Sequence, residues 1–541
     1  MRVLFSMLMV LSALTGLAVG SQSTEFTVSS MTFPLASDYI SIKSNADLVD
    51  YRGSGTADDP YVIEGISLDD HVGSGIVIKN TDAHILIRNC TLDDLSGGYE
   101  YLDRVSVRVD NAKNVRVEDC SVEGVEVEDA ENMRFEDCTG EHISFSGVKD
   151  GTIKNSRIRS VLVQQIMTPD PFTEGSFDPF NVTIKPSQNC LITSCSSFEI
   201  VLLSVENSAV EGCHVEDGWL MAFSPVDVIF RDNEVVNATL EMNMPSNATF
   251  ENMTLVEPRI SSAGFSSEHY ALNLKNSTVD GKEVFYYENQ RGLELKDLDA
   301  GYVWLVNCPE SRIEAVEAFG IFVVNSSDVT IEGSKIDQGG IHLAFSSDCW
   351  ISNNTVNNSR AREGIKLDVG CSNNTLRQNV VTKSGRYYAS GIMSSGIDTS
   401  SSEGHNTISG NVVTNAGVGL DVGRKNTIIG NTIANNAIGL RASDDHNEIA
   451  QNNFVYNGID AQQRSTIAWK DVSFANNSWD GNFWTSYRGE DEDGDGVGDT
   501  LHVVPAGWPS SGEAEAVAEE QVVDNAPMME PISDPVGVDS N

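Results

Sequence analysis

One short phrase recurs in the C-terminal half of the chain and limits what the chain can fold into. It reads NTISGNVV, NTIIGNTI and NEIAQNNF, with a central aliphatic residue at Ile408, Ile428 and Ile449. These centres are separated by 20 and 21 residues. A period of this length is typical of repeat folds, in which each repeat forms one structural unit that stacks on the next.

The same phrase can be followed back through most of the sequence, which gives fourteen copies. Five residues after the centre, twelve of the fourteen copies carry an aliphatic residue or Phe, and the two exceptions are Gly140 and Ser197. The recurring apolar residue predicts a continuous core. The eleven further centres are Ile87, Val117, Phe135, Ile153, Ile192, Val210, Phe230, Phe250, Ile331, Ile351 and Leu376.

The position three residues after each centre predicts how the repeats stack. It holds mainly Cys before residue 214 and mainly Asn after residue 232. Short β-branched runs separated by Asn, Gly and Asp indicate strands and turns rather than α-helical repeats. Stacked β-coils lie about 4.8 Å apart, so an inward Asn amide can bond to the equivalent Asn above and below. The pattern predicts an all-β, single-stranded parallel β-helix (solenoid) of roughly 20 coils with end caps.

The two ends of the chain differ from the repeats. Residues 1–20 combine a basic start, an apolar stretch and a small-residue cleavage site, which predicts a signal peptide and an extracellular or cell-surface location. A membrane anchor is the alternative. No second apolar stretch of that length follows, so the mature chain is predicted to lack a transmembrane segment. We expect an N-terminal cap over residues 21–66, the β-helix over residues 67–457 and a C-terminal cap over residues 458–541.

The composition is strongly acidic and restricts the possible partners. With 79 Asp and Glu against 35 Lys and Arg, the formal net charge is −44, which argues against nucleic acid as a partner. The nine cysteines mostly occupy stacked positions of the repeat. Their parallel side chains would place neighbouring Cβ atoms about 4.8 Å apart, outside the usual disulfide range. We therefore expect buried free thiols, with disulfides as the alternative.

The predicted C-terminal cap carries a cluster of aromatic residues followed by an acidic loop. Trp479, Phe483, Trp484 and Tyr487 are expected to form a hydrophobic plug. The loop DEDGDGVGD then matches the first nine positions of an EF-hand-type calcium loop, although His502 replaces the Glu of the twelfth position. The prediction is a structural Ca²⁺ site completed by other groups or water, and a solvated acidic turn is the alternative. The predicted ligands are Asp491, Asp493, Asp495, Val497 and Asp499.

A basic and aromatic cluster interrupts the repeats between Ile351 and Ile408, where two insertions fall close together. Asp368 and Asp398 lie nearby in the sequence. Loops that project from a rigid scaffold often carry binding sites, so this cluster is the candidate carbohydrate site. A solvated loop is the alternative. The cluster consists of Arg360, Arg362, Lys366, Lys383, Arg386, Tyr387 and Tyr388.

Several segments together resemble one known family. They are GSGTADDPYVIEG near the N-terminus, the N-T-I-x-G-N repeats, VDGKEVFYYENQ, and the endings GNFWTSYRG, DEDGDGVGDT and DNAPMMEP. The chain thereby resembles the NosD-like and CASH-type (carbohydrate-binding and sugar-hydrolase) right-handed parallel β-helix proteins, which are exported and mostly archaeal surface proteins. The resemblance implies a right-handed coil and leaves the activity open, because a fold does not determine function.

Three functions follow as hypotheses. The sequence favours an exported, calcium-stabilised β-helix that binds carbohydrate or cell-envelope components without catalysis. The alternative is a polysaccharide lyase, epimerase or glycoside hydrolase that uses the groove of the helix. The third hypothesis comes from the NosD resemblance and is periplasmic copper binding, although the nine His are scattered singly along the chain.

Overall fold

The computed structural model describes residues 40–69, 75–94, 105–169, 182–264, 266–270, 272–358, 363–383, 394–463, 465–468, 471–474, 476–504 and 522–533. These residues all belong to one compact unit, Asp38–Asn541. The predicted signal peptide, residues 1–20, lies outside them. Among the described residues, no helix is long and apolar enough to cross a membrane.

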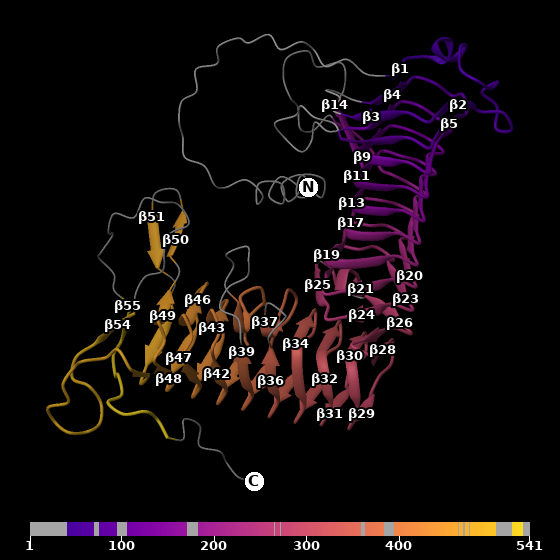
Figure 1. Ribbon diagram of the computed structural model, residues 1–541. Helices are drawn as coiled ribbons and strands as arrows, with labels where there is room; N and C mark the ends of the chain where they lie inside the picture. Colours follow the sequence, from indigo (N-terminus) through magenta and orange to yellow (C-terminus); the bar gives the residue numbers. More distant parts are fainter. Residues whose placement is uncertain are drawn as a thin grey trace, which may run out of the picture. The chain divides into compact units, whose positions relative to one another are not determined.

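Each turn of the chain builds one coil of a right-handed parallel β-helix, as predicted (Figure 1). A coil begins with a short strand, such as β10 (Arg134–Glu136), and continues after a tight turn into a longer one, β11 (Thr139–Ser146). At that turn Asp137 has a φ of 54°, a conformation that Asn and Asp tolerate better than most residues. The repeated Asn and Asp residues of the sequence are therefore the corners of the coils.

The short strands of successive coils form face 1 of the helix. Residues at the middle of each strand point inward, and Phe135 pairs in register with Val117 and Ile153. In the first stack, face 1 consists of β2 (Tyr61–Glu64), β5 (Ile85–Arg88), β8 (Val115–Glu118), β10, β12 (Thr152–Lys154), β16 (Leu191–Thr193), β18 (Ala209–Glu211), β20 (Ile229–Arg231), β23 (Thr249–Glu251) and β26 (Asn273–Lys275). In the second stack it consists of β29 (Glu294–Lys296), β31 (Arg312–Glu314), β33 (Thr330–Glu332), β35 (Trp350–Ser352), β38 (Thr375–Arg377), β41 (Thr407–Ser409), β44 (Thr427–Ile429), β47 (Glu448–Ala450) and β52 (Ser478–Asp480).

The longer strands bend at a corner and so form two further faces. Face 2 holds the part that follows the tight turn, and face 3 holds the part beyond the corner. In the first stack these faces consist of β1 (Ile40–Ile42), β3 (Ser67–Asp69), β4 (Ile76–Lys79), β6 (Thr91–Asp94), β7 (Val107–Asp110), β9 (Ser121–Glu128), β11, β13 (Arg157–Gln164), β17 (Ser196–Leu203), β19 (His214–Phe223), β21 (Glu234–Val236), β22 (Thr239–Asn243), β24 (Thr254–Val256), β25 (Arg259–Ala263) and β27 (Thr278–Val279). In the second stack they consist of β28 (Lys282–Glu288), β30 (Asp299–Val306), β32 (Glu317–Val324), β34 (Lys335–Ala344), β36 (Thr355–Asn358), β37 (Glu363–Leu367), β39 (Val380–Lys383), β40 (Ser395–Thr399), β42 (Val412–Thr414), β43 (Val418–Val422), β45 (Thr432–Ala434), β46 (Ile438–Ala442), β48 (Asn453–Val455), β49 (Ile459–Gln463) and β53 (Phe483–Trp484).

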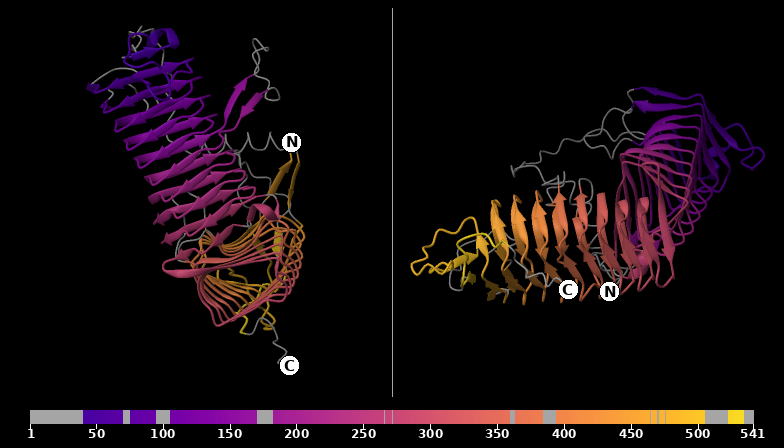
Figure 2. Two further views of the ribbon diagram at one scale, coloured as in Figure 1. Left: turned by 90° about the vertical axis from the view of Figure 1, so that its right-hand side faces the viewer. Right: turned by 90° about the horizontal axis from the view of Figure 1, so that it is seen from below.

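The coils divide into two stacks, which the sequence analysis did not predict (Figure 2). Strands β27 and β28 pair antiparallel around Gly281, whose φ is +79°, whereas the coils on either side pair in parallel. The apolar residues form two core clusters, and the first of them also includes Trp304 and Phe322 of the second stack. The division lies in the segment where the repeated phrase is weakest, because there the chain turns back instead of completing a coil.

Short elements complete the structure. Two 3-10 helices, η1 (Asn45–Leu48) and η3 (Ser267–Tyr270), are the helical segments of the described residues. Two antiparallel hairpins leave the coils: β14 (Ile166–Pro169) with β15 (Val182–Lys185), and β50 (Ser465–Ala468) with β51 (Asp471–Phe474). At the C-terminal end, β55 (Val522–Asp524) pairs with β52 and with β54 (His502–Val504). Strand pairing thus extends from Ile40 to Asp524.

The predicted asparagine ladder is confirmed. In the second stack, each Asn of the turn position donates its side-chain amide to the side-chain oxygen of the next, at distances of 2.9 to 3.0 Å. Each of these amides also bonds to a backbone carbonyl, so every side-chain amide of this ladder is partnered. The ladder runs through Asn354, Asn379, Asn411, Asn431, Asn452 and Asn482.

The nine cysteines are all buried and unpaired, in agreement with the expected free thiols. Those of the turn position donate to backbone carbonyls, as Cys138 does to Glu136 at 3.0 Å. Backbone carbonyls thus accept the hydrogen bonds of these thiols, while the Ser156 hydroxyl of the adjacent coil accepts the backbone N–H of Cys138. The change from Cys to Asn at the turn position falls within the first stack, between Cys213 and Asn233, and Cys308, Cys349 and Cys371 lie in the second stack.

Candidate functional site

A row of polar side chains crosses face 3 of the second stack. Its members stand in register on five consecutive strands, β34, β37, β40, β43 and β46, one coil apart. Because side chains alternate along a strand, these residues point away from the core while their neighbours, such as Ile365 and Ile397, are fully buried inside. We name the set the polar row: His342, Lys366, Asp398, Asp421 and Arg441.

Asp368 anchors the beginning of the polar row, just after β37. Its Oδ2 accepts hydrogen bonds from Lys366 Nζ at 2.8 Å, His342 Nε2 at 3.2 Å and the Tyr270 hydroxyl at 3.2 Å. Burial opposes its ionisation, but the hydrogen bond and charge of His342 and the charge of Lys366 outweigh burial and lower the pKa of Asp368. Asp368 is therefore a fixed negative charge that orients His342 and Lys366.

Asp421 and Arg441 form an ion pair at the other end of the polar row. Arg441 Nε lies 3.1 Å from Asp421 Oδ1, its Nη2 bonds to Oδ2, and Ser443 Oγ donates to Oδ1 at 2.9 Å. The carboxylate of Asp421 is buried, so its charge depends on this guanidinium. The hydrogen bond to Asp421 in turn raises the pKa of Arg441.

Asp398 lies between Asp368 and the Asp421–Arg441 ion pair. Unlike the carboxyl groups of Asp368 and Asp421, that of Asp398 is not paired with a cation among the described residues. Its Oδ1 accepts bonds from the backbone N–H and the hydroxyl of Ser400, at 2.9 and 2.7 Å. Burial, followed by the negative charges of Asp421 and Glu363, raises the pKa of Asp398 to about 6. A carboxyl group of this pKa exchanges its proton near neutral pH, which is the property that general acids and bases require.

Lys366 is the cation next to Asp398 in the row. Burial alone would discharge its ammonium group, but the charges of Asp368, Glu363 and Asp398 raise the pKa of Lys366 instead. It therefore remains charged and held by its carboxylate. The row presents a cation, a protonatable carboxyl, a carboxylate and a second cation in sequence along the helix.

The structure places only part of the predicted carbohydrate site. Lys366 and Asp398 belong to the polar row, and Asp368 contacts Lys366 from the end of β37. Lys383 instead ends β39 on face 2. Residues 359–362 join β36 to β37, and residues 384–393 join β39 to β40, so both insertions start and end beside the row. The other members of the cluster, Arg360, Arg362, Arg386, Tyr387 and Tyr388, lie outside the described residues.

Three members of the polar row were missed in the sequence. Asp421 and Arg441 both stand thirteen residues after a repeat centre, Ile408 and Ile428, so the repeat itself contained the signal. His342 stands eleven residues after Ile331, and Asp398 stands twenty-two after Leu376 because of the insertion between them. Only the strand register shows that these residues share one row with Lys366.

The acidic loop brings three of its predicted ligands together. Carboxylate oxygens of Asp491, Asp493 and Asp495 lie within 4.8 Å of one another, and no other group of three such ligand side chains occurs among the described residues. Backbone N–H groups of Gly494 and Gly496 bond to Asp491 at 2.7 and 3.0 Å, which closes the loop around that carboxylate. The chemistry of the set, all hard oxygens, fits Ca²⁺.

The remaining positions of the acidic loop have other partners. Asp499 Oδ2 accepts the backbone N–H of Glu492 at 2.5 Å, and Val497 pairs with Met528 of the tail. His502, at the twelfth position, stacks on Trp484 with ring centroids 4.5 Å apart. Burial lowers the pKa of His502, so the ring is neutral and belongs to the aromatic end of the coil.

Comparisons with known proteins agree with this fold. Residues 275–489 match the family model described as periplasmic copper-binding protein (NosD), a segment that contains the whole polar row and ends before the acidic loop. No match is found among functionally curated proteins.

Solved structures with similar folds include a periplasmic alginate epimerase, with 12% identity, a TM-score of 0.21 and coverage of 70% of this chain and 72% of that one. An alginate lyase gives 11% identity, a TM-score of 0.22 and coverage of 81% and 92%. A surface adhesin of Streptococcus pneumoniae gives 10% identity, a TM-score of 0.17 and coverage of 75% and 92%. The family match indicates a NosD-like β-helix over the second stack.

Proposed function

We propose that this protein is an exported, calcium-stabilised β-helix protein that binds carbohydrate of the cell envelope or surroundings through the polar row. The observation that carries the proposal is the alignment of five polar side chains on consecutive coils. Coils about 4.8 Å apart present donors and acceptors at regular intervals, which suits a linear polymer lying along the helix.

The charges of the row indicate which glycans it favours. Lys366 and Arg441 are each held by a carboxylate, and Asp398 adds a further acid. With a chain net charge of −44, a polyanionic glycan is repelled unless a divalent cation bridges it. We therefore expect neutral glycans to bind best, and uronic glycans to bind only in the presence of Ca²⁺.

The binding prediction concerns Lys366 and Asp398. Isothermal titration with a panel of neutral and uronic oligosaccharides is expected to identify a ligand whose affinity falls at least tenfold in Lys366→Met and Asp398→Asn, about 1.4 kcal/mol or more. Lys296→Met is the matched control, because Lys296 also pairs with a carboxylate, Glu314, but lies on face 1. Unchanged affinity in both polar-row variants would contradict the proposal.

A second candidate function is catalysis on the bound glycan. The observation that favours it is the protonatable Asp398 beside Lys366, since a lyase, epimerase or hydrolase needs a group that exchanges a proton near neutral pH. Prolonged incubation of each glycan with the protein, followed by assays for reducing and unsaturated ends, separates the two candidates. Product that is absent with Asp398→Asn would establish catalysis and exclude a purely binding role.

The calcium prediction concerns the acidic loop. Addition of EGTA is expected to lower the melting temperature of the wild-type protein by several degrees, because a ligand at one hundred times its Kd stabilises the folded state by about 2.7 kcal/mol. Asp493→Asn should abolish this EGTA effect, whereas the control Asp480→Asn, an exposed acid of β52, should retain it. An identical melting temperature with and without EGTA would exclude a structural Ca²⁺ at this loop.

The family match carries a third candidate, copper binding. Copper favours sulfur and imidazole ligands, and the described residues hold no group of three His or Cys with ligand atoms in mutual reach. Titration with Cu(I) and Cu(II) decides this point. Tight stoichiometric binding would favour copper over carbohydrate as the primary ligand.

A further inference from the structure

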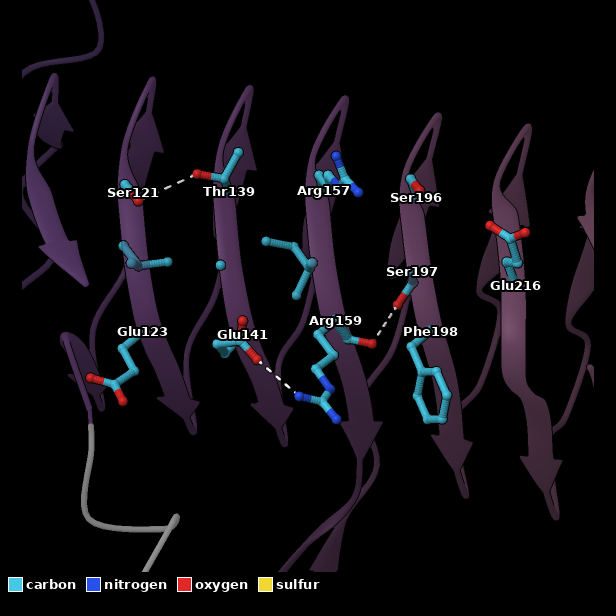
Figure 3. Close-up of a pocket in the computed structure, with 13 residues that line it drawn as sticks. Ser121, Glu123, Thr139, Glu141, Arg157, Arg159, Ser196, Ser197, Phe198 and Glu216 are labelled. Atoms are coloured by element: carbon cyan, nitrogen blue, oxygen red, sulfur yellow. Dashed lines mark hydrogen bonds and ion pairs between the residues drawn. The ribbon is translucent and has the colours of Figure 1, made fainter. Parts of the chain in front are cut away.

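A trough runs along face 2 of the first stack, away from the polar row. It has a volume of about 530 Å³ and crosses strands β9, β11, β13 and β17 (Figure 3). One rim carries hydroxyl groups and a guanidinium, contributed by Ser121, Thr139, Arg157 and Ser196. It lies outside residues 275–489, the segment that matches the NosD family model.

The two exceptions to the apolar repeat form the floor of this trough. Gly140 stands in register between Val122 and Ile158, and a Cβ at Gly140 would lie 2.7 Å from the carbonyl oxygen of Val122. Ser197 replaces the aliphatic residue of its coil, and its hydroxyl donates to the backbone carbonyls of Arg159 and Glu199, at 3.1 and 2.7 Å. Val122 and Ile158, the register partners of Gly140, are buried in the core, so the two departures reduce side-chain volume beneath the trough.

A β-bulge adjoins one end of the trough, where Phe198 belongs to the lining and Trp219 packs beside it. The register of β17 and β19 shifts after Ser197, and Gly218 fits there because a Cβ would lie 1.9 Å from the Phe198 carbonyl oxygen. The bulge places Trp219, which is 41% exposed, edge-on to Phe198 with ring centroids 5.7 Å apart. Bulges commonly redirect side chains beside functional sites.

The opposite rim combines acids with a fixed cation. Arg159 pairs with Glu141 at 3.5 Å and lies over the Phe198 ring, 5.9 Å from its centroid. Glu123 and Glu216 add two further carboxylates. Across the trough, the exposed guanidinium of Arg157 makes no ion pair and no side-chain hydrogen bond with any described residue, so it is a donor available to a ligand.

We propose that the trough is a second binding site and that its ligand is a neutral oligosaccharide. Hydroxyl, carboxylate and guanidinium groups offer both donors and acceptors to sugar hydroxyls, and the exposed ring of Trp219 offers an apolar face to a sugar ring. Three carboxylates disfavour a polyanion, and the polar rims disfavour an apolar ligand. The trough runs across successive strands, so an extended chain of sugars fits its direction better than a compact molecule.

The test uses the full-length protein and neutral hexasaccharides of several linkages, titrated by calorimetry. At least one is expected to bind, with affinity reduced tenfold or more in Trp219→Ala and Arg157→Met. The matched controls are Trp350→Ala, a tryptophan of similar exposure (42%) on face 1, and Arg134→Met, an exposed arginine of β10. Both controls should bind as the wild type does.

Three results would overturn the proposal. One is that no neutral hexasaccharide binds the wild-type protein; another is that Trp219→Ala and Arg157→Met bind with unchanged affinity. The third is that Asp398→Asn abolishes the binding while Trp219→Ala retains it, which would assign the ligand to the polar row instead. Because the two sites lie on different stacks, these variants distinguish failure of this proposal from failure of the proposed function.

Discussion

Replacing Asp524 with alanine is expected to unfold the C-terminal coils well before the rest of the second stack. Asp524 is fully buried and lies at the end of the asparagine ladder. Its Oδ2 accepts bonds from the Asn482 side-chain amide at 2.9 Å and from Trp484 Nε1 at 3.0 Å. Its Oδ1 accepts the backbone N–H of Gly481 at 3.1 Å. The carboxylate thus supplies the acceptor that a further coil would otherwise provide.

The expected effect is large because the alanine variant leaves several buried donors without an acceptor. Each unsatisfied buried donor costs about 1 to 3 kcal/mol, so the loss of three should cost at least about 3 kcal/mol. In a solenoid such a loss is local, since each coil contacts only its neighbours. Trp479 and Trp484, both buried in the same coils, should become exposed at lower denaturant concentration than the remaining structure unfolds.

Tryptophan fluorescence and hydrogen exchange during denaturant titration measure this effect. The control is Asp480→Ala, which removes an exposed carboxylate of the same coil. It should leave the transition within about 0.5 kcal/mol of the wild type, as surface substitutions usually do. Equal stability of the two variants would show that Asp524 does not terminate the ladder.

The β-helix could be predicted from the sequence because the buried Asn position of the repeat must have its side-chain amide hydrogen-bonded in every coil. Asn431 must satisfy its amide inside the core, and the equivalent Asn residues of the two neighbouring coils bond to it at 2.9 and 3.0 Å. The constraint is local and recurs with the period, so a single sequence reveals it. The buried Trp479 and Trp484 likewise continue the apolar columns of Ile449 and Phe454, which makes the expected aromatic plug the last coil of the stack.

The sequence analysis predicted neither the division into two stacks nor the polar row, and each has its own physical reason. The antiparallel pairing at Gly281 depends on a single turn that has no counterpart elsewhere in the repeat. The row depends on register: insertions change the distance between Lys366 and Asp398 along the chain, while strand pairing keeps them one coil apart. Outward residues also carry no core constraint, so their identities do not repeat.

Replacing Asp398 with asparagine is expected to make the protein more stable at pH 7.5 while weakening glycan binding. The pKa of Asp398 is about 6, raised from 3.8 by burial and by the charges of Asp421 and Glu363. Above pH 6 the folded state therefore carries a carboxylate that is more costly there than in the unfolded chain. A shift of this size corresponds to up to about 3 kcal/mol.

The pH dependence of this gain follows from the sign of the shift. At pH 4 the carboxyl group is protonated in the folded state and about half ionised in the unfolded chain, so Asp398→Asn and the wild type should differ in stability by less than about 1 kcal/mol. As the pH rises from 4 to 6, the unfolded chain ionises first and the wild type loses stability relative to the variant. Above pH 6 the difference should stay constant, because the group is then ionised in both states.

Denaturant midpoints at pH 4 and pH 7.5 measure the gain, with Glu294→Gln as the control, an exposed acid of face 1. The control should show the same stability as the wild type at both values. Lower stability of Asp398→Asn at pH 7.5 would contradict the prediction. At neutral pH the carboxylate of Asp398 destabilises the fold. If Asp398→Asn raises the stability and also loses glycan binding, Asp398 serves the ligand rather than the fold.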